Sequence, residues 1–214
     1  MAIGDGSADN WEVFQFAKAD LVAPQTYDLS RRLRGQAGTD GNMPQVWPTG
    51  SLVVLLDTGP RQIELPLSAR GLARHYRIGA AARGTDDPTV VHRVEAFQGI
   101  GLRPYAPVHL RVAMDDAGDL QMNWVRRTRI DGDSWESVEV PLGEDREIYL
   151  IRVIRNDALV RELTVTAPAW AYKVAQRLGD GVTGSFILQV AQMSDRFGHG
   201  PFTQFAWNSP PGGE

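Results

Sequence analysis

Apolar and polar residues alternate with a period of two along much of this chain, and no other feature constrains the fold as strongly. In the segment 108–114 the alternating apolar residues are Val108, Leu110, Val112 and Met114. Successive side chains of a β-strand point to opposite faces, so this alternation predicts a strand. Comparable segments lie at 120–124, 149–153, 159–165 and 186–190. The chain is therefore predicted to be all-β.

The front half shows the same pattern less regularly. Residues 11–16 and 89–94 are predicted strands, and the run Leu-Val-Val-Leu-Leu at 52–56 is predicted to be a buried strand. Helical spacing is found only in the short segment 68–76. The fold predicted for this half is an irregular β-domain.

The segment 99–104, Gly-Ile-Gly-Leu-Arg-Pro, interrupts any continuous element and marks a domain boundary. The ends of the chain are small and polar or rich in proline and glycine. The predicted organisation is a flexible N-terminus at 1–9, a β-rich domain at 10–103, a β-sandwich at 104–207 and a flexible tail at 208–214.

The predicted sandwich resembles a fibronectin type III domain. Pro107 precedes the first strand, Trp124 lies at an inward position of the second, and Phe186 opens a late strand where that family more often has tyrosine. The chain has no cysteine, which rules out the disulfide-bridged antibody type of sandwich.

Charge and motifs exclude several functions. A net charge of −4 argues against nucleic-acid binding, and no apolar run is long enough for a membrane span. The G-x-G-x-x-G string at 179–184 precedes a strand, whereas a dinucleotide site needs it to open a helix. Acidic residues at 115–119 and 131–136 fit turns better than calcium loops. We therefore predict no enzyme and no catalytic, cofactor-binding or metal-binding residue.

Longer strings carry a more specific resemblance. The segment 27–39, Tyr-Asp-Leu-Ser-Arg-Arg-Leu-Arg-Gly-Gln-Ala-Gly-Thr, is similar to a stretch in tail-tip proteins of siphophages. Further similar strings lie at 10–16, 71–76, 101–107 and 124–135. Together they resemble the C-terminal region of the baseplate hub ("megatron", or host-specificity) protein of gene transfer agents and related phages. Members of that family are usually much longer, so this chain is expected to be either a separate tail-tip subunit or a fragment.

The resemblance implies a structural role in the virion, at the tail tip or baseplate, with assembly of the hub and presentation of a host-contact surface. It also implies other tail or baseplate subunits as partners and a homotrimer in the assembly. The alternative is a carbohydrate-binding module for host surface polysaccharide, because such modules are also β-sandwiches. Of six tryptophans, Trp47 and Trp135 lie near turns, and we expect them to be exposed for glycan or partner contacts.

Overall fold

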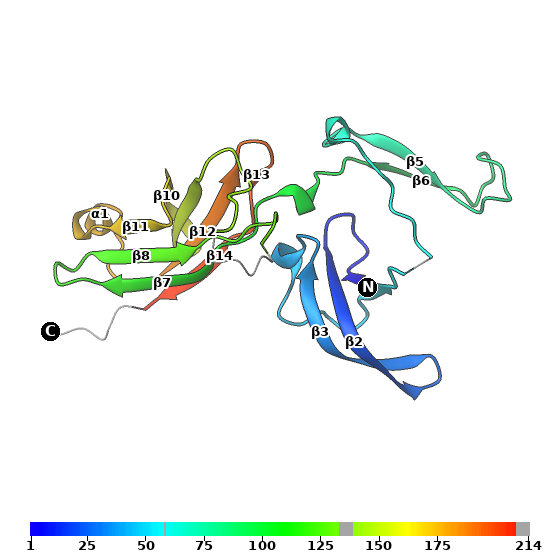
Figure 1. Ribbon diagram of the computed structural model, residues 1–214, viewed down its shortest axis with the longest axis horizontal. Coiled ribbons are helices and arrows are strands. Elements are labelled where there is room, and N and C mark those ends of the chain that lie inside the picture. Colours follow the sequence, from blue (N-terminus) through cyan, green and yellow to red (C-terminus); the bar gives the residue numbers. More distant parts are fainter. Residues whose placement is uncertain (58, 133–138, 209–214) are drawn as a thin grey trace. The chain divides into compact units, whose positions relative to one another are not determined.

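The computed structural model describes residues 1–57, 59–132 and 139–208, and the chain divides into two compact units, Met1–Gly101 (unit 1) and Leu102–Glu214 (unit 2) (Figure 1). The all-β prediction is confirmed. The strands of unit 1 are β1 (Ala2–Gly4), β2 (Trp11–Ala23), β3 (Thr26–Gln36), β4 (Leu52–Val54), β5 (Arg74–Ile78) and β6 (Val91–Glu95). Those of unit 2 are β7 (Val108–Met114), β8 (Leu120–Val125), β9 (Tyr149–Arg155), β10 (Ala158–Val165), β11 (Ala169–Tyr172), β12 (Phe186–Ser194), β13 (Gly198–His199) and β14 (Thr203–Trp207).

Unit 1 contains a four-stranded antiparallel sheet in the order β3-β2-β1-β4. The prediction of a flexible terminus at 1–9 is wrong for Ala2–Gly4, which is a strand between two others. The polar residues 5–10 are the connection of a β1–β2 hairpin. Asp5 accepts hydrogen bonds from Ser7 N and Asn10 Nδ2, which stabilise the turn that leads the chain back into β2. The sequence also predicted the flexible tail 208–214, and residues 209–214 lie outside the described part.

The prediction of a buried strand at 52–56 is also wrong. All five side chains are 39–54% exposed, although Leu52–Val54 does form β4. β4 is at the edge of the sheet, and an apolar run becomes buried only where a second layer covers it. The outer part of the β2–β3 hairpin, residues 17–28, is exposed at every position and is called the arm below.

The remaining strands of unit 1, β5 and β6, form a two-stranded hairpin. The short helix expected at 68–76 is not formed as such. Leu67–Ala69 is one 3₁₀ turn, and Arg74–Ile78 is strand β5. Gly71, with φ of +70°, separates the two, and its backbone N–H bonds to the carbonyl of Phe97 beyond the hairpin. Pairing across the hairpin therefore prevails over the helical spacing.

Unit 2 is a sandwich of two antiparallel sheets. β7, β8 and β11 form one sheet in the order β11-β8-β7, and β10, β9, β12 and β14 lie side by side in the other. The first, second and fifth strands thus face the third, fourth, sixth and last, which is a fibronectin type III-like arrangement, as predicted. A short helix, α1 (Val174–Gly179), connects β11 towards β12.

The core of unit 2 lies between the two sheets. Trp124 of β8 is 3% exposed and packs edge-on against Tyr149 of β9, with ring centroids 5.2 Å apart. Leu188 and Val190 of β12 are fully buried beside them. The inward position predicted for Trp124 is confirmed. Alternation in β8, where every second residue is buried, places these side chains on the inner face.

Over the described residues, none of the helices has the length and apolar character needed to cross a membrane.

Candidate functional site

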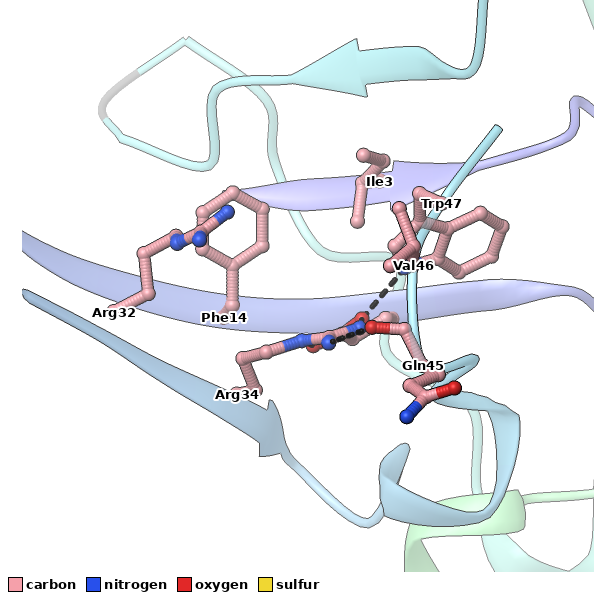
Figure 2. A pocket seen from close by; sticks show the side chains of 8 residues that line it. Ile3, Phe14, Arg32, Arg34, Gln45, Val46 and Trp47 are labelled. Atoms are coloured by element: carbon pink, nitrogen blue, oxygen red, sulfur yellow. Dashed lines mark hydrogen bonds and ion pairs between the residues drawn. The ribbon is translucent and has the colours of Figure 1, made fainter. Parts of the chain in front are cut away.

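The candidate site lies on one face of the unit 1 sheet, where β2 and β3 place charged residues among apolar ones (Figure 2). Burial alternates along β2 at residues 11–14, so Glu12 and Phe14 share the covered face. β3 is paired antiparallel with β2 and brings Arg32 and Arg34 to the same place. The segment 44–47 crosses this face and covers Glu12.

Glu12 is a fully buried carboxylate with four hydrogen bonds. Arg34 donates from Nε to Oε1 at 2.8 Å and from Nη2 to Oε2 at 2.6 Å, so the pair is two-pronged. The indole Nε1 of Trp47 donates to Oε2 at 2.6 Å, and the backbone N–H of Gly35 donates to Oε1 at 3.3 Å. These groups compensate the burial of the charge and hold it in one position.

The segment that covers Glu12 is itself held by Arg34. The guanidinium donates to the carbonyl oxygens of Pro44 at 2.9 Å and Gln45 at 3.2 Å. One arginine therefore connects β2, β3 and the segment 44–47.

The environment of Glu12 favours its ionised form. Burial alone would raise its pKa, but the hydrogen bonds from Arg34, Trp47 and Gly35 outweigh it, and the pKa lies below its ordinary value. The bond to Glu12 raises the pKa of Arg34. The pair is therefore a neutralised structural group in the wall of the site.

A cavity of about 280 Å³, the first cavity, opens beside this pair. Its lining residues are Ile3, Glu12, Phe14, Arg32, Arg34, Gln45, Val46 and Trp47. In the view of Figure 2, Arg32 and Phe14 lie at one side and Trp47 at the other. Arg32 is exposed and has no ion-pair partner among the residues that the structure describes. Its positive charge is therefore available to a ligand.

A second cavity, of about 470 Å³, shares Trp47 and Val46 with the first. Its other lining residues are Asp5, Asn10, Asn42, Pro44, Pro48, Thr49, Gly50 and Ser51. Trp47 thus forms a wall between a cavity that is lined by Arg32 and a cavity whose lining includes amide and hydroxyl groups beside two prolines.

The two tryptophans predicted as contact residues have different outcomes. Trp47 is half-buried rather than fully exposed, because its indole N–H is bonded to Glu12, but its ring does line both cavities. Its role in binding stays a prediction. Trp135 lies outside the described residues.

Sequence reasoning missed the Glu12–Arg34 pair. The two residues are far apart in the chain, and only the sheet register brings them together. A signal was present, because Glu12 shares a face with Phe14 and Phe16 in a strand pattern. A lone carboxylate at an inward position predicts a buried cationic partner, although it does not identify that partner.

Among the acidic residues at 115–119, Asp115 shows the turn chemistry that the sequence predicted, and Asp119 contacts a distant segment instead. Asp115 accepts backbone N–H bonds from Ala117 and Asp119 and closes the turn between β7 and β8. Asp119 accepts from Lys173 Nζ at 2.9 Å and from the backbone N–H of Val174. Within the described ranges no group of three or more potential ligands could hold a metal ion. The acidic positions 133 and 136 are not described.

The glycine string at 179–184 precedes β12, as the sequence predicted, but it begins at the last residue of helix α1, which the sequence did not predict. Two histidines that are 17 residues apart in the sequence lie close together because of strand pairing. His75 Nδ1 and His92 Nε2 lie 2.9 Å apart across the β5–β6 hairpin, on an exposed face.

Unit 1 also exposes an unusual amount of apolar surface. Eighteen large apolar side chains are exposed in its described part, compared with five in that of unit 2. The arm alone exposes Leu21 at 64%, Val22 at 62% and Tyr27 at 60%. Large exposed apolar patches mark interaction surfaces more often than scattered single residues do.

Among known proteins, one family model is similar to part of this chain. The family described as "Rcc01698-like, C-terminal" matches residues 1–54, about a quarter of the chain. No curated protein matches this chain. Among solved structures, domains d3–d4 of the rat CD45 extracellular region align with a TM-score of 0.37 and 9% identity, over 90% of this chain and 94% of that one. A structure described as "Myokine structure" aligns with a TM-score of 0.33 and 17% identity, over 50% of this chain and 99% of that one.

Proposed function

We propose that this chain is a structural subunit of a phage-like tail tip or baseplate, which docks through unit 1 and carries the sandwich as a rigid domain. The observation that supports this most directly is the burial of unit 1, where only Ala2, Phe14 and Ala69 are buried apolar residues within the described part. A unit of this length usually buries a much larger core. Its exposed apolar side chains gain favourable free energy only against another surface.

The arm is the part of unit 1 best suited to docking. Residues 17–28 form a two-stranded ribbon, and no element in the described part of the chain covers it. Such ribbons are only marginally stable in water. Leu21, Val22 and Tyr27 lie around the end of this ribbon, on both sides of the turn. Insertion between neighbouring subunits would bury these side chains and order the ribbon at the same time.

The identity of the assembly rests on sequence. The matched family covers residues 1–54, which contain the four-stranded sheet and the arm, and the strings at 27–39 and 101–107 resemble baseplate hub proteins. The family match lies within unit 1, whereas the strings that resemble hub proteins occur in both units. On this proposal the chain resides in the virion, three copies surround the tail axis, other tail subunits are its partners, and the sandwich loops contribute to a host-contact surface.

Substitution of the arm tests the proposal. We expect Leu21→Asp to remove the chain from purified tail particles, because a carboxylate would be buried in the docked arm. The matched control is Leu178→Asp in helix α1 of unit 2, since Leu178 is 63% exposed and Leu21 is 64% exposed. Immunoblotting of particles purified from cells that express each variant measures incorporation.

Incorporation of Leu178→Asp together with loss of Leu21→Asp supports docking through the arm. Equal incorporation of both variants contradicts it. If the wild-type chain is absent from tail particles, the tail-tip assignment itself is wrong.

A further inference from the structure

We infer that the two cavities beside Trp47 form a binding site for an acidic saccharide, with the carboxylate of one sugar unit on Arg32. This inference concerns unit 1 alone and does not depend on the tail-tip proposal. It rests on the charges of the first cavity, the fixed Trp47 ring and the different chemistry of the second cavity.

The first cavity carries one uncompensated positive charge. Three charged side chains line it, and two of them, Glu12 and Arg34, neutralise each other through a two-pronged ion pair. Arg32 is the third and is free among the described residues. A guanidinium binds a carboxylate with two parallel N–H···O bonds, so a carboxylate is the group that this charge selects.

The rest of the first cavity suits a ring with an apolar face. Phe14, Ile3 and Val46 line it together with the Trp47 ring. The Trp47 ring is held by its bond to Glu12, so little side-chain entropy is lost when a ligand packs on it. Sugar rings present C–H groups on one face and hydroxyl groups at the edge, which fits an aromatic wall bordered by polar atoms.

The second cavity extends the site beyond a single sugar unit. Three of its polar side chains already donate within the chain: Asn10 to Asp5 at 2.7 Å, Asn42 to the carbonyl of Asp9 at 2.8 Å and Ser51 to that of Pro48 at 2.8 Å. They therefore present acceptor oxygens, beside the hydroxyl of Thr49, to which hydroxyl groups of a next unit can donate. Asp5 also lines it, and its bonds to Asn10 and Ser7 lower its pKa to about 2, so it is negatively charged near neutral pH. An acidic unit is therefore favoured in the first cavity and disfavoured in the second.

This distribution favours a saccharide over an acidic peptide. A peptide made only of Asp and Glu would satisfy Arg32, but it has no ring to pack on Trp47, and its further carboxylates would meet the negative charge of Asp5 in the second cavity. An acidic oligosaccharide engages the cation, the aromatic wall and the hydroxyl-binding groups in one extended ligand.

Calorimetric titration of the full chain tests the inference. The probe is a trisaccharide of uronic acid, and the comparison ligands are a neutral trisaccharide and an Asp/Glu tetrapeptide. We expect the uronic acid trisaccharide to bind at least about tenfold more tightly than either. Its affinity should also fall as salt is added, because Arg32 is exposed.

Arg32→Gln should weaken binding of the acidic trisaccharide by about tenfold or more, and Arg32→Lys should weaken it less. Arg31→Gln is the matched control, since Arg31 is the exposed neighbour on β3 that does not line the cavity. Arg31→Gln removes the same charge from the chain as Arg32→Gln does, but it removes no charge from the cavity. We therefore expect no loss of affinity. Circular dichroism checks that each variant is folded.

Three results would overturn the inference. They are the absence of binding by the acidic trisaccharide, equal affinities of the Arg32→Gln and Arg31→Gln variants, and tighter binding of the tetrapeptide than of the saccharide. The last result would assign the site to a protein carboxylate.

Discussion

Units 1 and 2 are close in length and are built from the same alternating pattern, yet they bury very different numbers of apolar residues. Thirteen apolar residues are buried in the described part of unit 2, and three in that of unit 1. Conversely, of the twenty-three large apolar side chains that are exposed among the described residues, eighteen belong to unit 1. The difference lies in the layers, because unit 2 has two sheets that face each other.

Alternation of apolar and polar residues does not by itself determine which side chains are buried. A strand pattern sorts side chains onto two faces, but burial needs a second layer against one of them. In unit 2 the strand pairs β7–β8 and β9–β10 contribute to opposite sheets and supply that layer for each other. In unit 1 the β2–β3 hairpin continues past the sheet as the arm. Among the described residues, unit 1 is therefore held mainly by hydrogen bonds and the Glu12–Arg34 ion pair, and unit 2 has a large core in addition to its ion pairs.

The largest expected effect is the loss of a core side chain in unit 2. Leu188→Ala removes a fully buried side chain between the two sheets, which costs about 3 kcal/mol of the free energy of unfolding of that unit. Hydrogen exchange followed by mass spectrometry reports the two units separately. We expect faster exchange across β8, β9 and β12 and no change in unit 1. The same variant accelerating exchange in both units would show that they unfold together.

A smaller effect is expected from the buried charge of unit 1. Glu12→Gln leaves Arg34 without its carboxylate and weakens the hold on the segment 44–47, at a cost of about 2 kcal/mol. Exposure of part of the Arg34 side chain keeps this cost below that of a fully buried pair. Asp28→Asn, on the exposed arm, is the control and should be neutral. Amide hydrogen exchange in β1, β2 and β3 is measured for the Glu12→Gln and Asp28→Asn variants. Equal exchange rates in the two variants would contradict the proposed role of Glu12.

Acid should reproduce part of that effect. The pKa of Glu12 in the folded chain lies below its ordinary value of 4.5, so the ion pair stabilises unit 1 above about pH 4.5. This stabilisation is lost as the pH falls through the folded pKa, because the carboxylate is then protonated. As the pH falls below 4.5, we expect amide hydrogen exchange in β2 of the wild-type chain to become faster relative to that in the Glu12→Gln variant. An identical pH dependence in wild type and Glu12→Gln would exclude Glu12 as the source.

Much of unit 2 could be predicted from sequence, because its strands carry their own pattern. Leu120, Met122 and Trp124 alternate with polar residues, and each is buried as the pattern indicates. The turn at 115–119 likewise depends on local chemistry, since Asp115 bonds to backbone N–H groups within four residues. Predictions of this kind succeed where the deciding interactions are local.

In unit 1 the same reasoning failed where the deciding contact is made by a residue that is distant in the sequence. The run 52–56 has the composition of a buried strand, and only the position of β4 at a sheet edge leaves it exposed. Ala2–Gly4 looked too short and polar in its surroundings to be a strand, and pairing on both sides makes it one. The candidate site depends on Glu12 meeting Arg34, which is a consequence of register between β2 and β3.

The smallest effect is expected for ion pairs on the surface, and it should be the same in both units. Arg146 and Asp195 in unit 2 are 66% and 44% exposed, and Lys18 and Asp20 in unit 1 are 60% and 51% exposed. Exposed pairs gain little because water screens them and long side chains lose freedom. We expect Arg146→Ala and Lys18→Ala each to leave the free energy of unfolding of their unit unchanged within the error of hydrogen exchange. A change of 1 kcal/mol or more for Lys18→Ala alone would mean that unit 1, lacking a large core, depends on its surface charges as unit 2 does not.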